Sequence, residues 1–279
     1  MGAKSKIEWT DNTFNPWIGC TRVGPGCDHC YAERFGQRFG VAWGPGALRR
    51  RTSEANWREP LRWAARIRIT GGPRERVFCA SLADVFDHEA PEVWRQDLWA
   101  LIRATRDVLD WLLLTKRIGN AASMLPPDLQ DGEPGVWLGM TAVTQEEFDR
   151  DWRKMARLKA YIRFLSYEPA LGPLSLKNEF ALYQHGALDI DAEPTVMDLK
   201  WLSQLGGRWS DSPDWLITGG ESGPGARPPH PDWFRQVREQ CKAAGVPFFL
   251  KQITDARGQK LPMNEWPEDL QNLREYPHA

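Results

Sequence analysis

The chain has 279 residues, of which 42% are hydrophobic and 26% charged, and its formal net charge at pH 7 is −1. A chain of this size can bury a substantial core, and its balanced charge argues against a strongly electrostatic coat for nucleic acid. No stretch approaches the length of a membrane-spanning helix, and the residues after Met1 lack an apolar export signal. We therefore expect a cytoplasmic protein with no membrane partner. It should form one domain over 1–279, with a basic insertion at 40–75 and an acidic one at 174–213.

Short apolar segments alternate with helical patterns along the chain. The predicted strands are continuously apolar, as is typical of strands covered on both faces. They are Val77–Ala80, Trp111–Leu114, Val136–Met140, Ile162–Leu165, Trp215–Thr218 and Phe248–Leu250. A seventh strand is predicted at Phe14–Ile18, although Pro16 disfavours a central position. The predicted helices are Tyr31 to about Phe39, Pro91–Thr105, Glu146–Leu158 and Pro231–Ala244. This alternation predicts an α/β fold with parallel strands, open or curled into a barrel.

The basic insertion at 40–75 has two interpretations. Its arginines are interleaved with Trp57 and Trp63, which is typical of a phosphate-facing flap with stacking side chains. In that interpretation the contacts to nucleic acid would come from Arg49, Arg50 and Arg51. The other interpretation is a solvated surface helix whose tryptophans pack on the barrel.

The loop after each of the six apolar strands carries polar or ionisable residues. Parallel barrels carry their chemistry on the loops after the carboxyl ends of the strands, so these residues should form the rim of one active site. The candidates for binding a cofactor or substrate are Ser81, Asp84, Lys116, Arg117, Thr141, Glu168, Gly219, Gly220, Glu221, Ser222 and Lys251. Lys116, Arg117 and Lys251 could bind a carboxylate or phosphate, and the alternative for each charged residue is a salt bridge that fixes its loop.

Three thiols, those of Cys20, Cys27 and Cys30, lie within eleven residues of the sequence. Gly24–Gly26 should let this loop turn tightly enough for the thiols to converge. Soft thiolates bind iron–sulfur clusters or zinc. Three cysteines without a fourth suit a 4Fe–4S cluster with one iron left open. The helix that starts at Tyr31 would point its amino end at the bound species.

Structural zinc is the rival interpretation, with His29 or His230 as the fourth ligand, and the spacing alone leaves both metals open. The two remaining cysteines, Cys79 and Cys241, fall inside a predicted strand and on the apolar face of a predicted helix. Free cysteine behaves there as a small hydrophobic residue, so we expect both to be structural.

Eight stretches in order along the chain resemble a bacteriophage-associated three-cysteine family that is itself similar to radical S-adenosylmethionine (SAM) proteins. They are Lys6–Asp11, Asn15–Cys20, Pro25–Glu33, Leu114–Arg117, Val136–Gly139, Arg163–Pro169, Gly219–Arg227 and Pro247–Gln252. The family has no well-defined biochemistry, and the resemblance spans nearly the whole chain.

The resemblance implies a partial (β/α) barrel of the radical SAM type and a 4Fe–4S cluster on Cys20, Cys27 and Cys30. SAM would bind the open iron, with Tyr31 among the residues around it. An external electron donor would drive its cleavage to methionine and a 5′-deoxyadenosyl radical, which would abstract hydrogen from an unidentified substrate. The alternative is a non-enzymatic zinc or iron–sulfur protein that binds nucleic acid or a partner protein.

Two features depart from the radical SAM pattern. The cysteines are separated by six and then two residues, where the common motif has three and then two. The Gly-Gly-Glu that usually follows the second strand occurs here at Gly219–Glu221, after a late strand. Ser81 and Asp84 follow the strand where that motif would be expected, so both loops are candidates for binding SAM.

Overall fold

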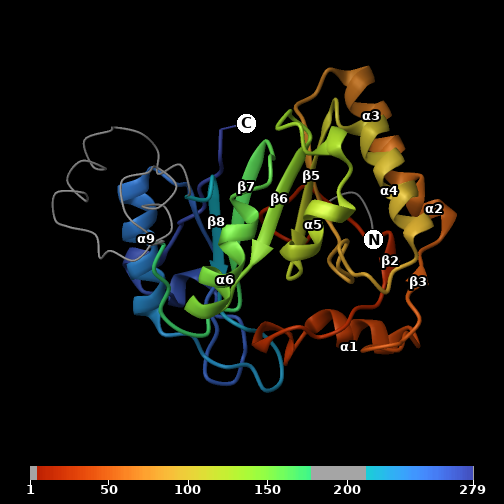
Figure 1. Ribbon diagram of the computed structural model, residues 1–279. Helices are drawn as coiled ribbons and strands as arrows, with labels where there is room; N and C mark the ends of the chain where they lie inside the picture. Colours follow the sequence, from red (N-terminus) through yellow and green to blue (C-terminus); the bar gives the residue numbers. More distant parts are fainter. Residues whose placement is uncertain (1–4, 177–211, 279) are drawn as a thin grey trace, which may run out of the picture.

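Seven parallel strands form one curved sheet in the order β1-β4-β5-β6-β7-β8-β9 (Figure 1). The computed structural model describes residues 5–176 and 212–278, so most of the predicted acidic insertion at 174–213 lies outside the described residues. The strands are β1 (Asn12–Phe14), β4 (Glu75–Cys79), β5 (Leu109–Thr115), β6 (Val136–Thr141), β7 (Ile162–Tyr167), β8 (Trp215–Gly219) and β9 (Phe248–Gln252). All neighbours in the sheet pair in parallel, which gives a half-barrel. The six apolar strands predicted from the sequence are confirmed, with bounds that differ by at most two residues.

The predicted strand Phe14–Ile18 is wrong as a continuous element. Phe14 ends β1, which pairs with β4 at the edge of the half-barrel. The chain then breaks at Pro16, which has no N–H for a ladder hydrogen bond. Beyond it, β2 (Trp17–Ile18) pairs antiparallel with β3 (Arg50–Arg51) in a separate two-stranded sheet. The chain is therefore led away from the sheet just before Cys20.

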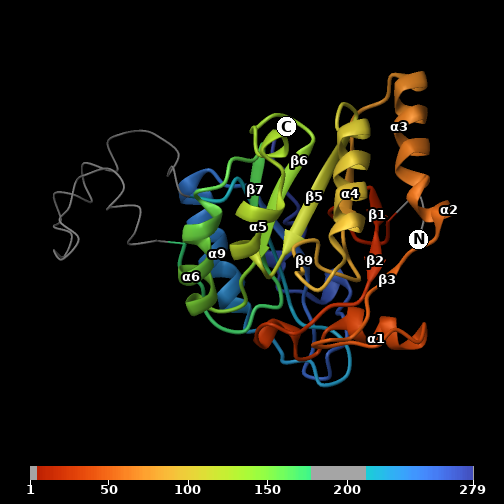
Figure 2. The ribbon, with the colours of Figure 1, turned by 45° about the vertical axis from the view of Figure 1, so that its right-hand side comes forward.

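Helices cover the outer face of the half-barrel, as both views show (Figure 1, Figure 2). They are α3 (Glu59–Thr70), α4 (Glu92–Thr105), α5 (Ile118–Met124), α6 (Gln145–Met155) and α9 (Pro231–Ala244). The helix α1 (Tyr31–Arg38) lies instead across the end of the sheet toward which the strands run, and α2 (Glu54–Trp57) leads into α3. Gly245, with φ +66°, ends α9 as a left-handed cap. Within the described residues, no helix is long and apolar enough to cross a membrane.

The concave side of the half-barrel is filled by an aromatic cluster. Alternate strand residues point inward, and they include Phe78, Trp137, Phe164, Trp215 and Phe249. Trp9, from the segment before β1, packs among them with its ring centroid 4.6 Å from that of Phe78. These rings fill the barrel below the carboxyl ends of the strands.

The basic segment 40–75 packs against the barrel. Trp57 and Trp63 are both buried in the main core, as the surface-helix interpretation requires. The prediction that Arg49, Arg50 and Arg51 together face nucleic acid is wrong for Arg49, whose side chain is fully buried.

Each of these three arginines has a partner within the fold. Arg49 forms ion pairs of 2.8 Å with Asp87 and 2.5 Å with Glu89. Arg51 pairs with Asp97 at 2.9 Å and lies 3.9 Å above the ring of Trp57. Arg50 is exposed and donates to a backbone carbonyl of the α1 cap at 2.6 Å. The segment is thus fastened to the fold by charge pairs and does not form a free cationic flap.

Gly139 in β6 is a position where a side chain cannot fit, because a Cβ there would overlap the ring of Phe164. We expect Gly139→Ala to lower the free energy of unfolding by about 1–3 kcal/mol, the usual cost of overpacking a core. Chemical denaturation measures this. Gly172→Ala is the matched control, since its Cβ would meet nothing within 4 Å. Equal effects in the two variants would contradict the packing argument.

Candidate functional site

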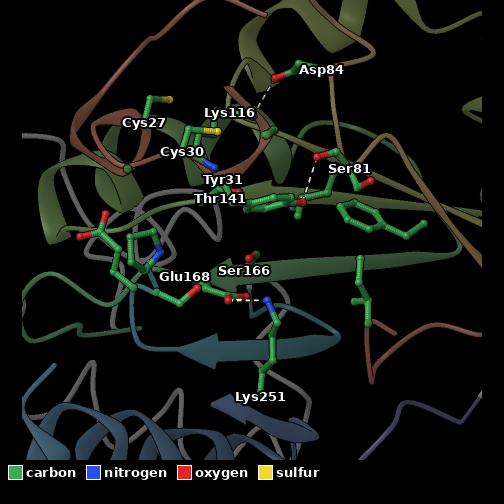
Figure 3. A pocket seen from close by; sticks show the side chains of 18 of the residues that line it. Cys27, Cys30, Tyr31, Ser81, Asp84, Lys116, Thr141, Ser166, Glu168 and Lys251 are labelled. Atoms are coloured by element: carbon green, nitrogen blue, oxygen red, sulfur yellow. Dashed lines mark hydrogen bonds and ion pairs between the residues drawn. The ribbon is translucent and has the colours of Figure 1, made fainter. Parts of the chain in front are cut away.

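A cavity of about 380 Å³ lies at the carboxyl ends of the strands (Figure 3). Its walls include residues at or just after the carboxyl ends of six of the seven strands, together with the cysteine segment, residues 20–30. The structure brings together there Cys20, Cys27, Cys30, Tyr31, Ser81, Asp84, Lys116, Arg117, Thr141, Glu168, Gly220, Glu221, Ser222 and Lys251. Gly219 is the one predicted site residue that does not line the cavity, because it ends β8 and packs against Gln252.

Two glycines allow the cysteine segment to sit close to the barrel. A Cβ at Gly26 would lie 2.8 Å from Cγ1 of Val143, and one at Gly24 would overlap the carboxylate of Glu147. The φ of Gly24 is −173°, an extended conformation open to any residue. The glycines therefore serve close approach to the β6–α6 loop, where the sequence predicted a tight turn. A short 3-10 turn at Pro25–Cys27 then leads into α1, whose N-cap is Cys30.

The three cysteines are free thiols that line the cavity. Among residues 5–176 and 212–278, no group of three His, Cys, Asp or Glu side chains is placed to hold one metal ion. A structural zinc needs four ligands at about 2.0–2.3 Å from one centre. The zinc ligand His230 predicted as one option caps α9, is 62% exposed and does not line the cavity. A cubane cluster instead places each cysteine on a different iron, so it does not require the three thiols to meet at one ion.

Arg117 connects the cysteine segment to the loop after β4. Its Nη1 donates to the Sγ of Cys20 at 3.2 Å and to Oδ2 of Asp84 at 3.2 Å. Its Nη2 donates to the carbonyl of Thr21 at 2.5 Å. Burial raises the pKa of Cys20 to about 12, and the charge of Asp84 adds to this while Arg117 opposes it. The free thiol is therefore neutral at physiological pH.

Asp84, predicted as a candidate for binding SAM, has both oxygens engaged by the protein. They accept hydrogen bonds from the hydroxyl of Thr115 at 2.7 and 2.9 Å, and from the backbone N–H groups of Phe86 and Lys116 at 3.0 and 3.1 Å. With Arg117 as well, this carboxylate has no acceptor site to spare. We assign Asp84 to positioning the loops around the cavity.

Glu221, the second acidic candidate, is held in the same way by Arg227. The guanidinium makes two hydrogen bonds to the carboxylate, of 2.9 and 2.6 Å, and the backbone N–H of Arg227 adds a third of 2.9 Å. Arg227 also donates to the carbonyl of Pro25 at 2.8 Å and to Asp28 at 3.1 Å. Through Arg227, the Gly-Gly-Glu loop therefore holds the cysteine segment at Pro25 and Asp28. Arg227 is the last residue of the Gly219–Arg227 stretch, but sequence reasoning gave it no role.

Two further candidates bind each other. The ammonium of Lys251 lies 2.5 Å from Oε1 of Glu168, which is the salt bridge that the alternative interpretation expected. Tyr31 donates from its hydroxyl to the carbonyl of Ser81 at 2.9 Å, and the hydroxyl of Ser81 bonds Asn15. Sequence reasoning did not identify Asn15, which follows the first strand and links it to this loop.

Three polar groups on the cavity wall have no hydrogen-bond partner in the described part of the chain: the ammonium of Lys116 and the hydroxyls of Thr141 and Ser166. They come from consecutive strands, β5, β6 and β7, and all are labelled in Figure 3. Neither hydroxyl is a fully buried atom without a partner, so both are reachable from the cavity. These groups are available to a ligand.

The seven-stranded half-barrel, with its cavity at the carboxyl ends, is a partial (β/α) barrel of the radical SAM type, as the sequence predicted. A cysteine-to-serine mutant of spore photoproduct lyase, a radical SAM enzyme, is 10% identical, with a TM-score of 0.50, over 91% of this chain and 79% of its own. Spore photoproduct lyase complexed with dinucleoside spore photoproduct gives 10% identity and a TM-score of 0.46 over 88% of this chain. The chain spans 65% of that protein's length.

The chain belongs to the DUF5131 family, described as a protein of unknown function, whose profile matches residues 4–269. No functionally curated protein matches the sequence.

The Glu221–Arg227 clasp makes stability depend on pH. Burial raises the pKa of Glu221, but the hydrogen bonds and charge of Arg227 outweigh it, so the pKa lies below its ordinary value of 4.5. A lowered pKa means that the stabilisation is complete above pH 4.5 and is lost as the pH falls through the folded-state pKa. We expect Glu221→Gln to lower the free energy of unfolding at pH 7 by about 1–2 kcal/mol.

This difference from the wild type should shrink as denaturation is repeated at lower pH, below 4.5. Glu265→Gln serves as the control, since Glu265 is exposed and its side chain has no partner among the described residues. A Glu221→Gln difference that stays constant down to the lowest pH would count against the clasp.

Proposed function

We propose that this protein is a radical SAM enzyme whose 4Fe–4S cluster is held by Cys20, Cys27 and Cys30. The observation that carries the proposal is the placing of three free cysteines on one wall of the cavity at the strand ends. Three thiols beside one cavity suit a cluster with one open iron, and the half-barrel is of the matching type. When bound, cluster and SAM supply one-electron chemistry that breaks a carbon–sulfur bond of SAM and yields a radical able to abstract hydrogen.

The unpartnered cavity groups are the ones we propose for SAM. The ammonium of Lys116 would bind its carboxylate, and the hydroxyls of Thr141 and Ser166 would bind its polar groups. Lys116 suits this position because its side chain lies against the cysteine segment, where a Cβ at Gly26 would be 3.3 Å from Cε of Lys116. Glu168 is fixed by Lys251 through one oxygen, and no other residue in the described ranges 5–176 and 212–278 bonds its second oxygen, which would accept a ribose hydroxyl. The aromatic cluster below excludes water from the floor of the cavity.

The substrate stays unidentified. The prediction of nucleic-acid binding depended on Arg49, Arg50 and Arg51, and the burial of Arg49 removes part of its basis. An external electron donor and an association with bacteriophages are further predictions that follow from the sequence resemblance. The alternative, a non-enzymatic zinc or iron–sulfur protein, differs in requiring no response to SAM.

The first test is metal analysis of protein purified without oxygen. We expect about four irons per chain and an electron paramagnetic resonance signal after reduction that shifts when SAM is added. Cys20→Ser, Cys27→Ser and Cys30→Ser should each lose most of the iron. Cys241→Ala is the control, because Cys241 is buried in α9 and should leave the iron content unchanged. One zinc and no iron would overturn the proposal.

The second test concerns the SAM site. Lys116→Ala should weaken SAM binding about tenfold or more, since a hydrogen bond to a charged group contributes about 1.5–3 kcal/mol. Equilibrium binding of SAM to iron-loaded protein measures this, and iron content should stay at the wild-type level. Lys159→Ala removes an exposed lysine outside the cavity and is the control. Loss of iron in Lys116→Ala would show that the residue supports the cysteine segment and does not bind the cofactor.

A further inference from the structure

The three cysteine sulfurs have unequal surroundings. In the part of the chain that the structure describes, only the Sγ of Cys20 accepts a hydrogen bond from another side chain, that of Arg117 at 3.2 Å. Cys27 is buried, and Cys30 is the N-cap of α1 with its thiol at the edge of a small apolar cluster. One of the three proposed cluster ligands is therefore in direct contact with a cation.

Arg117 cannot leave this position easily. Its side chain is only 7% exposed. The same guanidinium bonds Asp84 at 3.2 Å and the carbonyl of Thr21 at 2.5 Å. Its backbone N–H donates at 2.7 Å to the hydroxyl of Thr115, which itself donates to Asp84. The donor is thus held rigidly beside the sulfur.

The charge balance around Cys20 is set by this pair. Asp87, the other nearby carboxylate, is neutralised by Arg49 at 2.8 Å, with both side chains fully buried. The side chain of Asp84 is 7% exposed and lies 3.2 Å from the Arg117 guanidinium. Charges in such a poorly solvated site act more strongly than they would in water. The sulfur of Cys20 is therefore in contact with the positive charge of Arg117, and the negative charge of Asp84 is bonded to the same guanidinium.

We propose that Arg117 is a positioning residue that raises the reduction potential of the cluster through Cys20, and that Asp84 moderates this effect. The assignment rests on the proposed function. A reduced cluster carries one more negative charge than an oxidised one, so a cationic donor to a ligating sulfur stabilises the reduced form. Asp84 acts with the opposite sign, because its negative charge beside the guanidinium disfavours the added electron.

The test is a redox titration of iron-loaded protein without SAM, followed by electron paramagnetic resonance. Arg117→Met should lower the midpoint potential by at least a tenfold change in the reduction equilibrium, about 59 mV for one electron. Asp84→Asn should shift the potential in the opposite direction. Arg117→Lys, which keeps the charge, should stay closer to the wild type than Arg117→Met.

Opposite signs for the two substitutions are the decisive result, because a role confined to holding the fold would not produce them. Lys116→Met is the matched control: it removes the adjacent cavity cation, which bonds no sulfur among the described residues, and should shift the potential less than Arg117→Met. Unchanged potentials, shifts of the same sign, or loss of iron from both Arg117 variants would overturn the assignment. A wild-type chain without a cluster would overturn it together with the proposed function, whereas the other outcomes leave that function intact.

Discussion

The cysteine segment depends on two arginines, each neutralised by a carboxylate and each directed at the backbone of that segment. Arg117 reaches the carbonyl of Thr21 near its start, and Arg227 reaches the carbonyl of Pro25 near its middle. A backbone carbonyl in a loop has no ladder partner, and a charged donor satisfies it at a greater energy than a neutral one. The loop has little apolar surface of its own, so these contacts fix where its three thiols lie on the cavity wall.

The two carboxylates, Asp84 and Glu221, explain why sequence reasoning found the site but mistook some of its roles. Each follows an apolar strand, and that position at the carboxyl end of a parallel sheet predicts the rim of a cavity. What the carboxylate binds there is decided by residues that are distant in sequence or hidden within a motif. Asp84 is saturated by groups 31–33 positions further along the chain, and Glu221 by a residue six positions away. A pattern of polar residues cannot distinguish a ligand site from an internal ion pair.

The same reasoning applies to the fold and to the basic segment. Continuous apolar runs predicted six strands correctly, because a strand covered on both faces carries mostly apolar side chains on both sides. The prediction of one strand over Phe14–Ile18 is wrong because two short strands lie on either side of Pro16 and pair with different partners. Arg49 and Arg51 resembled a cationic surface because their partners, Asp87 and Asp97, lie in another element. The net charge of a segment does not predict whether its arginines are exposed when the carboxylates that pair with them lie elsewhere in the sequence.

The cavity divides its polar groups according to their place in the sheet. In the sheet, β4 and β8 lie on either side of the middle strands. The loops after them carry Asp84 and Glu221, which pair with the two arginines that bond the cysteine segment. The middle strands β5, β6 and β7 keep Lys116, Thr141 and Ser166 without partners. These three groups line the same cavity as the cysteines and can be reached from it, so they are available to a ligand. The ion-paired loops after β4 and β8 therefore lie on either side of the strands that carry the unpartnered groups. Arg117, which follows β5 and contacts the sulfur of Cys20, connects the two sets of residues.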